Sequence, residues 1–191
     1  MSVLEVVEKF VSINGEGTKA GQLAVFIRFK GCNLNCEYCD TKWANEADAT
    51  AQQMTKEDIL EYVLSTGVKN VTLTGGEPLL RDGIEDVIEC LADNNLNVEI
   101  ETNGSIPLDN IRKLHKDNVT FTMDYKLSCS GMEQAMRLEN FSVLNKNDTV
   151  KFVAGCHEDL VRTKQIIEKY NLYGKCNLYI SPVFGMIEPE E

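Results

Sequence analysis

Short runs of β-branched and aromatic residues alternate with amphipathic stretches along most of the chain. Six runs are rich in Val, Ile, Thr or Phe, or are bounded by Gly, Asn or Pro. They predict strands over residues 23–29, 70–74, 97–102, 119–124, 149–154 and 177–181. A further apolar run over residues 4–13 predicts an edge or N-terminal strand.

Four helices are predicted between these strands, over residues 59–64, 82–92, 107–115 and 158–170. The first follows a segment from Thr55 to Asp58 that resembles a capping box, with Asp in place of the usual Glu or Gln. The third begins with Pro107, which suits a first helical turn. The second has apolar residues spaced three and four apart, at Ile84, Val87, Ile88 and Leu91.

This alternation predicts an α/β fold. Repeated strand–helix units require right-handed crossovers and a mainly parallel sheet. Six strands with helices on one side predict an incomplete TIM-type barrel, (β/α)6-like rather than closed. Active sites in such barrels lie at the C-terminal ends of the strands, so chemistry is expected where the strands stop. The 191 residues are expected to form a single domain.

The composition favours a small-molecule substrate. The chain has 30 acidic and 19 basic residues and a net charge of −11, which opposes nonspecific binding to nucleic acid or to an anionic membrane. It has no run of about 18 apolar residues and no signal-peptide pattern at its start. Seven cysteines without a secretory signal indicate a reducing cytoplasm, where thiols serve metals or chemistry.

Three cysteines follow the strand over residues 23–29 with the spacing Cys-x3-Cys-x2-Cys: Cys32, Cys36 and Cys39. Thiolates that converge this closely select zinc, copper(I) or an iron–sulfur cluster. A structural zinc site needs a fourth ligand, but the next cysteine is Cys90, inside a predicted helix. Three ligands leave one coordination position open for a substrate or cofactor. The alternative, three unligated or loosely zinc-bound thiols on an exposed loop, would be prone to oxidation.

A second motif, Thr74-Gly75-Gly76-Glu77-Pro78, ends the next strand. Two glycines at a strand end permit a close approach of the backbone to a ligand. Alone, this motif would indicate only a turn. Its place about 35 residues after the cysteine loop, at a strand end, favours a role in the same site.

Cys-x3-Cys-x2-Cys with Tyr38 before the last cysteine resembles the radical S-adenosylmethionine (SAM) superfamily. The resemblance implies that the three thiolates hold a [4Fe–4S] cluster and that SAM chelates the fourth iron through its amino and carboxylate groups. One electron from the cluster would then cleave SAM to a 5′-deoxyadenosyl radical, while the protein orients and shields these groups. The Gly-Gly-Glu segment is similar to the superfamily motif that hydrogen-bonds the SAM amino group.

Within the superfamily, the chain resembles the family of 7-carboxy-7-deazaguanine synthases over residues 5 to about 105, and more loosely beyond. The resemblance implies 6-carboxy-5,6,7,8-tetrahydropterin as substrate, hydrogen abstraction at C6, ring contraction, loss of ammonia, regeneration of SAM and a requirement for Mg2+. The segments that carry it are Ile13-Asn14-Gly15-Glu16-Gly17, Val25-Phe26-Ile27-Arg28-Phe29, Cys39-Asp40-Thr41 and Glu101-Thr102-Asn103-Gly104.

The family resemblance assigns roles to individual residues. Arg28 would pair with the substrate carboxylate, a task suited to a planar guanidinium, although a surface salt bridge is the alternative. Thr41 would bind Mg2+ through its hydroxyl, with water and substrate as the other ligands, or would serve only as a turn residue. The remaining substrate-binding residues would be Ile13, Asn14, Gly15, Glu16, Thr74, Glu101 and Asn103. SAM would be bound by Tyr38, Asp40, Gly76, Asp124, Lys126, Ser181, Pro182 and Val183.

The chain departs from the family pattern at three places. Asn14 stands where the family often has Gln, and Asp124 stands where it has Ser. Family members continue into a C-terminal segment with a substrate-contacting His, so we expect the natural chain to be longer than residues 1–191, whose last residues resemble the first turn of a helix.

The resemblance also implies a homodimer and an external one-electron donor of flavodoxin or ferredoxin type.

Two other functions stay open at this point. An enzyme that activates a glycyl-radical protein would use the same cysteine spacing, but it would not need Arg28 or the Asp40-Thr41 pair. An electron-transfer or structural iron–sulfur module would need a fourth thiolate. The remaining cysteines could bind an auxiliary cluster, but their wide spacing favours buried structural cysteines: Cys90, Cys129, Cys156 and Cys176.

Overall fold

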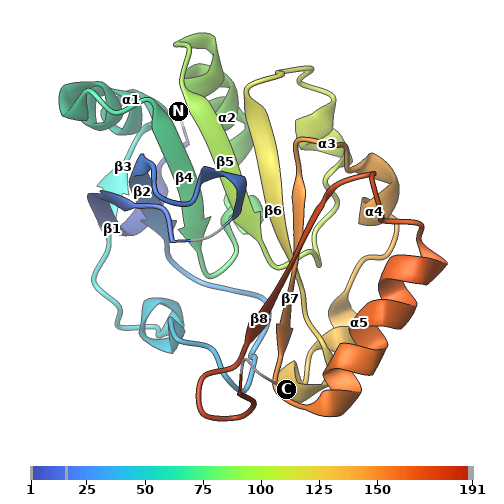
Figure 1. Ribbon diagram of the computed structural model, residues 1–191. Coiled ribbons are helices and arrows are strands. Elements are labelled where there is room, and N and C mark those ends of the chain that lie inside the picture. The colour runs from blue at the N-terminus through green and yellow to red at the C-terminus, as the bar shows by residue number, and fades with distance from the viewer. Residues whose placement is uncertain (1, 16, 189–191) are drawn as a thin grey trace.

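The computed structural model describes residues 2–15 and 17–188, and Glu16 and residues 189–191 lie outside the described part. Its centre is one eight-stranded sheet with the order β3-β1-β2-β4-β5-β6-β7-β8. The strands are β1 (Leu4–Ile13), β2 (Leu23–Phe29), β3 (Gln52–Met54), β4 (Asn70–Gly75), β5 (Asn97–Thr102), β6 (Val119–Tyr125), β7 (Thr149–Ala154) and β8 (Asn177–Pro182) (Figure 1).

The six strands from β2 to β8 in this order are parallel to one another, and β1 and β3 add an antiparallel edge. The sheet is open, which confirms the prediction of an incomplete barrel with a mainly parallel sheet. The run over residues 4–13 does form a strand, but it is not the edge, because β3 pairs with its outer side.

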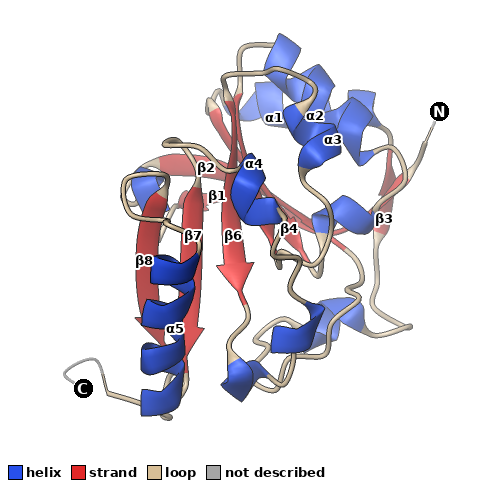
Figure 2. Ribbon diagram, turned by 90° about the vertical axis from the view of Figure 1, so that its right-hand side faces the viewer, coloured by secondary structure: helices blue, strands red, loops and turns tan. Residues whose placement is uncertain are grey.

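The helices cover the outer face of the curved sheet (Figure 2). They are α1 (Lys56–Thr66), α2 (Ile84–Asp93), α3 (Asp109–Arg112), α4 (Asn140–Val143) and α5 (His157–Lys169), and short 3-10 turns occur at η1 (Gly17–Lys19), η2 (Lys42–Asn45), η3 (Pro78–Leu80), η4 (Ser128–Ser130) and η5 (Glu133–Ala135). The predicted helix over residues 107–115 is wrong in length, since α3 has four residues. His115 adopts a φ of 52°, which a right-handed helix cannot contain.

Both hydrogen bonds of the predicted capping box at the start of α1 are present. The Thr55 hydroxyl accepts a hydrogen bond from the Asp58 backbone N–H at 3.2 Å, and the Thr55 N–H donates to the Asp58 carboxylate at 2.8 Å. Asp therefore replaces Glu in this motif without loss of either bond, and two backbone N–H groups that a helix start leaves unpaired are satisfied.

Side chains alternate between the two faces of each strand. In β5, Val98 and Ile100 are buried in the hydrophobic core beneath the helices, whereas Glu99 and Glu101 point to the other, concave face. The hydrophobic core therefore lies between sheet and helices, and the polar residues of the strands line the inside of the partial barrel. This arrangement supplies functional groups to the interior.

The β1–β2 connection turns over this interior. A Cβ added to Gly17 in η1 would lie 3.7 Å from the Glu99 carboxylate and 4.0 Å from the Thr122 hydroxyl. The dark-blue segment in front of the sheet in Figure 1 is this connection. Among the described residues, no helix is long and apolar enough to cross a membrane.

Candidate active site

A cavity of about 750 Å³ opens at the C-terminal ends of the parallel strands. These strand ends form the lower edge of the sheet in Figure 1. The cysteine loop, the Gly-Gly segment and the strand ends all contribute to its wall. Fifteen of the residues expected from the sequence line it: Arg28, Cys32, Cys36, Tyr38, Cys39, Asp40, Thr41, Thr74, Gly76, Glu101, Asn103, Asp124, Lys126, Pro182 and Val183.

Four expected residues do not line this cavity, and Glu16 lies outside the described residues. Ser181 pairs with Val153 in the β7–β8 ladder. Ile13 is 61% exposed, and a Cβ added to Gly15 would have no atom within 4 Å among the described residues outside its chain neighbours. Asn14 is buried, and its side-chain nitrogen has no hydrogen-bond partner among the described residues, so it is available to a ligand.

The three cysteines line one cavity, but their sulfur atoms do not all lie within 4.8 Å of one another. In the described part of the chain, the one three-ligand group whose ligand atoms all lie within 4.8 Å of one another does not include them. Tetrahedral zinc would hold its sulfur ligands about 3.8 Å apart. A [4Fe–4S] cluster binds each thiolate to a different iron and needs wider spacing. The donor set therefore fits a cluster with three protein ligands.

The cysteine loop is held from two sides. The Glu37 backbone N–H donates to the Ser130 carbonyl at 3.1 Å, and the Asn103 side chain donates to Cys32 Sγ at 3.6 Å and to Asn33 Oδ1 at 3.0 Å. Burial raises the pKa of the Cys36 thiol. An electropositive cluster would offset this cost by binding the thiolate.

The two glycines at the end of β4 approach protein backbone more closely than any side chain would allow. A Cβ on Gly75 would lie 2.3 Å from the Phe29 carbonyl oxygen, and one on Gly76 would lie 2.1 Å from the Gly31 carbonyl oxygen. The close neighbours of the two glycines are thus the end of β2 and the start of the cysteine loop. Gly76 also lines the cavity, so the same residue fixes the loop and faces the site.

Glu77, the third residue of the motif, is fully buried and braces two strand ends. Its carboxylate accepts hydrogen bonds from the Asn103 N–H at 2.7 Å, from the Leu79 N–H at 3.0 Å and from the Thr102 hydroxyl at 3.0 Å. Burial raises its pKa to about 7, although these hydrogen bonds oppose the shift. Glu77 thus ties the end of β4 to the end of β5 and does not face the cavity.

Strand register places charged and hydroxyl side chains in two successive layers of the interior. Arg28 is opposite Thr74 and Glu101 is opposite Thr122, whereas Asp124, two residues beyond Thr122, is opposite Lys151. Burial raises the pKa of Glu101 to about 7, opposed by a hydrogen bond with Thr74. The Glu101 carboxyl therefore changes charge near neutral pH, which is the range in which a group can bind N–H donors or exchange a proton.

Asp124 and Lys126 form an ion pair at the end of β6, with Lys126 Nζ 2.8 Å from Asp124 Oδ2. Burial alone would lower the pKa of Lys126, but the Asp124 carboxylate raises it above its ordinary value. Asp124 Oδ1 is buried without a hydrogen-bond partner in the described part of the chain. It is an acceptor that a ligand hydroxyl or amino group can satisfy.

Three further expected residues already have partners near the cavity. Arg28 Nε donates to Glu8 Oε2 at 2.9 Å, so the salt bridge considered as an alternative is present at the cavity wall. The Thr41 hydroxyl lies 3.6 Å from Cys39 Sγ. Tyr38 donates its hydroxyl to the Val153 carbonyl at 3.4 Å, and burial raises its pKa to about 12.

Sequence reasoning missed several residues of the cavity wall: Asn45, Thr122, Lys151, Val153, Phe184 and Met186. A signal existed for Lys151, a charged residue inside an otherwise apolar strand. Phe184 and Met186 follow β8, and no sequence pattern indicated that they line the cavity. Both line the cavity and are exposed to solvent, Phe184 fully and Met186 to 53%.

The other cysteines are less buried than expected. Cys176 is buried, but Cys90, Cys129 and Cys156 are partly exposed. Cys129 and Cys156 are widely spaced in the sequence but adjacent in the structure, with their sulfur atoms 2.9 Å apart. Residues 27 positions apart meet here because η4 and the start of α5 follow neighbouring strands.

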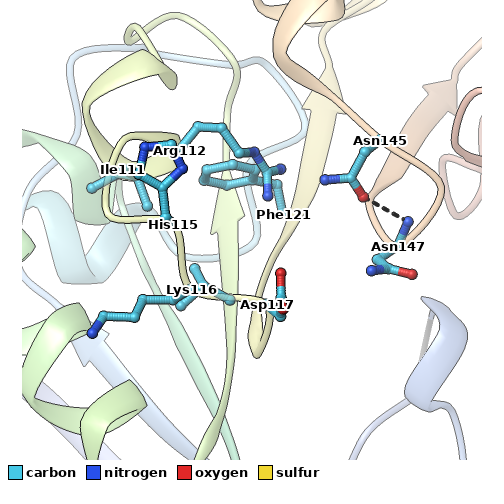
Figure 3. A pocket seen from close by; sticks show the side chains of 9 residues that line it. Ile111, Arg112, His115, Lys116, Asp117, Phe121, Asn145 and Asn147 are labelled. Carbon is cyan, nitrogen blue, oxygen red and sulfur yellow. Dashed lines mark hydrogen bonds between the residues drawn. The ribbon is translucent and has the colours of Figure 1, made fainter.

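A second cavity, of about 210 Å³, lies at the opposite, N-terminal ends of β6 and β7 (Figure 3). The Arg112 guanidinium covers the Phe121 ring at 4.8 Å, and it is also paired with the buried Asp148. None of the expected site residues lines this cavity. The chemistry therefore belongs to the larger cavity.

A model of the radical SAM superfamily matches residues 26–125. The chain is 60% identical over 187 residues to the 7-carboxy-7-deazaguanine synthase of Clostridium acetobutylicum, an alignment that covers 97% of this chain and 84% of that protein. The chain belongs to the 7-carboxy-7-deazaguanine synthase family of the radical SAM superfamily. The family member of Chlorobaculum tepidum is 34% identical over 189 residues, covering 97% of this chain and 83% of its own.

Solved structures share the fold of this family member. The crystal structure of QueE from Escherichia coli superposes with a TM-score of 0.72 at 23% identity, covering 95% of this chain and 85% of that chain. A structure of Streptococcus suis SuiB bound to S-adenosylmethionine superposes with a TM-score of 0.61 at 13% identity, covering 84% of this chain and 43% of that one. Both likenesses show the partial barrel.

Proposed function

We propose that this chain converts 6-carboxy-5,6,7,8-tetrahydropterin into 7-carboxy-7-deazaguanine, with loss of ammonia, as a radical SAM carbon–nitrogen lyase. The observation that carries the proposal is the convergence of three cysteine thiols, Arg28 and Glu101 on one cavity. The 60% identity to the Clostridium acetobutylicum synthase supports the choice of reaction.

Cys32, Cys36 and Cys39 would hold a [4Fe–4S] cluster. When bound, the cluster and SAM supply the one-electron chemistry that generates a hydrogen-abstracting radical at the substrate. The chain itself gives part of the cavity wall an apolar surface, at Leu34, Phe184 and Met186. It also keeps the fourth coordination position open, since no fourth thiol lines the cavity among the described residues.

SAM would bind against the strand ends between the cysteine loop and β8. The unpartnered Asp124 Oδ1 would accept a hydrogen bond from SAM, and Lys126 would face its carboxylate. Gly76 would present backbone to the amino group, while Tyr38 and Asp40 would flank the nucleoside. Pro182 and Val183 would contact the adenine, with Ser181 contributing through the backbone that positions them.

The substrate would occupy the interior of the partial barrel. Arg28 would bind the pterin carboxylate with its guanidinium, and Thr74 and Asn103 would border the ring. Glu101, ionised above about pH 7, would accept hydrogen bonds from ring N–H groups. The β1–β2 connection would close over the pterin edge through Ile13, Asn14, Gly15 and Glu16.

Mg2+ would bind at the edge of the cysteine loop. The Thr41 hydroxyl lines the cavity beside Cys39 and offers one oxygen ligand. Water and substrate oxygens would supply the rest, in keeping with the reluctance of Mg2+ to lose its hydration shell. We further propose a cytoplasmic homodimer that receives electrons from a flavodoxin or ferredoxin.

The test is anaerobic reconstitution with iron and sulfide, followed by turnover with the pterin, SAM, dithionite and Mg2+. We expect mass spectrometry to find 7-carboxy-7-deazaguanine and an equimolar amount of ammonia, with a lower rate when Mg2+ is omitted. Cys36→Ala should abolish product, and Cys90→Ala, outside the cavity, should not. Cleavage of SAM without any change in the pterin would contradict the proposed substrate and favour an activating enzyme.

A further inference from the structure

Two cysteines outside the proposed cluster site lie in contact. Cys129 Sγ donates to Cys156 Sγ at a distance of 2.9 Å, and both residues are partly exposed. Cys129 lies in η4, after β6, and Cys156 immediately precedes α5, after β7. A disulfide bond has an S–S distance of about 2.05 Å, so a shift of under about 1 Å would join these sulfur atoms.

The surrounding structure holds the pair in place. The buried Asp159 carboxylate accepts hydrogen bonds from the Ser128 hydroxyl at 2.8 Å, from the Cys129 N–H at 3.3 Å and from the Gly155 N–H at 2.9 Å. One carboxylate therefore joins the backbone on both sides of the thiol pair. Because the two segments are already fixed, little conformational entropy is lost when a bond forms between them.

A metal ion is the other occupant that this cluster of groups suggests, since Cys129, Cys156 and Asp159 each offer a ligand atom within 4.8 Å of the others. Two observations oppose it. Tetrahedral zinc would hold the sulfur atoms about 3.8 Å apart, which is wider than the observed contact. Both Asp159 oxygens are also engaged by the Ser128, Cys129 and Gly155 donors.

The pair adjoins the proposed cluster site. The Ser130 carbonyl, next to Cys129, accepts the hydrogen bond from Glu37 in the cysteine loop at 3.1 Å. On the other side, a Cβ added to Gly155 would lie 2.9 Å from Cys129 Cβ and 3.1 Å from Met186 Cε. Met186 lines the main cavity. A bond between the two sulfur atoms would therefore fix a segment that supports the cysteine loop.

We propose that Cys129 and Cys156 form a redox-active dithiol that closes to a disulfide and thereby stabilises the cysteine loop. The oxidant is a small disulfide such as glutathione disulfide. The Cys156 thiolate attacks one of its sulfur atoms and releases one glutathione thiolate. Cys129 then attacks Cys156 Sγ, its proton passing to the second glutathione as that thiol leaves. Two protein thiols are oxidised by two electrons, and one glutathione disulfide is reduced to two thiols.

The order of these two attacks follows from the contacts of Cys129. Its hydrogen bond to Cys156, together with burial, raises the pKa of Cys129 to about 12. Cys129 therefore keeps its proton until the mixed disulfide on Cys156 is in place beside it, and it acts as the resolving thiol.

The experiment uses cluster-loaded protein under anaerobic conditions, equilibrated with glutathione and glutathione disulfide at several ratios. The samples are then unfolded, alkylated and digested, and the peptides are identified by mass spectrometry. We expect the loss of two alkylatable thiols, a peptide that joins Cys129 to Cys156, unchanged iron content and full reversal by dithiothreitol. Both cysteines staying alkylatable at every ratio would overturn the proposal, as would stoichiometric zinc released from them.

Variants test the link to the cysteine loop. Cys129→Ser should leave Cys156 as a mixed disulfide with glutathione, and Cys156→Ser should leave Cys129 alkylatable. Cys90→Ser, a matched control, should behave as the unaltered protein. In the unaltered protein, the disulfide form should lose iron to a chelator more slowly than the dithiol form does. This difference in the rate of iron loss should be absent in Cys129→Ser and in Cys156→Ser. Equal rates of iron loss from the two forms would overturn the stabilising role.

Discussion

Arg28 and Glu8 form an ion pair across the antiparallel β1–β2 ladder, with Arg28 Nε donating to Glu8 Oε2 at 2.9 Å. The guanidinium also lines the main cavity, and Glu8 is the one hydrogen-bond partner that the described residues give it. A bond through Nε orients the planar group and leaves its terminal nitrogens to a carboxylate ligand. Glu8 is therefore a positioning residue for Arg28.

Arg28→Lys should weaken substrate binding without unfolding the protein. Lysine keeps the charge but loses the two-pronged hydrogen bonding of the guanidinium to a carboxylate. We expect KM for the pterin to rise by about 10- to 100-fold, in line with a loss of about 1.5–3 kcal/mol for a hydrogen bond to a charged group. Steady-state kinetics measure this, and circular dichroism checks the fold.

The matched control for Arg28→Lys is a substrate analogue without the carboxylate. It should bind the protein and the variant with equal affinity. Glu8→Gln should raise KM by less than Arg28→Lys does, because the guanidinium stays in place. An unchanged KM in Arg28→Lys would place the substrate carboxylate elsewhere.

Glu101→Gln should remove a pH dependence from catalysis. The raised pKa, about 7, means that the Glu101 carboxyl is neutral at pH 6 and charged at pH 8. If the charged form accepts hydrogen bonds from the substrate, kcat/KM should rise with an inflection near pH 7 and then level off. Glu101→Gln should show no such inflection and a plateau lower by about 10- to 100-fold.

Glu99 provides the control, since it lies on the same face of β5 and its charge raises the pKa of Glu101. Glu99→Gln should keep the inflection and move it to lower pH. A pH profile of kcat/KM that is the same in Glu101→Gln and in the unaltered protein would remove Glu101 from the substrate site.

Glu77→Gln tests, through the free energy of unfolding, the role of Glu77 in joining the ends of β4 and β5. In the unfolded chain this carboxyl loses its proton near pH 4.5, and in the folded chain its pKa is about 7. Between these pH values the folded state therefore binds more protons than the unfolded state. The contribution of Glu77 to the free energy of unfolding is full below pH 4.5 and is lost as the pH rises through 7. The shift corresponds to about 3 kcal/mol.

Glutamine does not titrate, so the free energy of unfolding of the protein relative to Glu77→Gln should fall by about 3 kcal/mol between pH 4.5 and 7.5. Urea unfolding of both proteins at several pH values measures this difference. All other titrating groups are common to both proteins, so their contributions to the free energy of unfolding cancel in the difference. A difference that does not change with pH would contradict the raised pKa.

The strands were predictable because the parallel sheet is buried on its helical face. The bounds of β2, β5 and β7 coincide with the predicted runs, where Val, Ile and Phe alternate with residues of the inner face. Strand β3 was missed, because Gln52 and Gln53 carry no strand signal and their strand exists only by pairing with β1. Here tertiary pairing overrides local preference.

The local motifs of the site were predictable, and the contacts between distant segments were not. Cys32, Cys36 and Cys39 share a loop, so their spacing alone indicates a common ligand. Lys151 stands out locally as a charged residue among apolar ones, but no local pattern specifies the register that sets it opposite Asp124. The contact between Cys129 and Cys156 likewise depends on the adjacency of β6 and β7.

The most direct test of the central claim is the electron paramagnetic resonance spectrum of the reduced, anaerobically reconstituted protein with and without SAM. We expect four irons per chain on the three cavity cysteines, and a signal that changes when SAM is added because SAM binds the one iron without a protein ligand. A signal indifferent to SAM, or zinc in place of the iron, would contradict the claim.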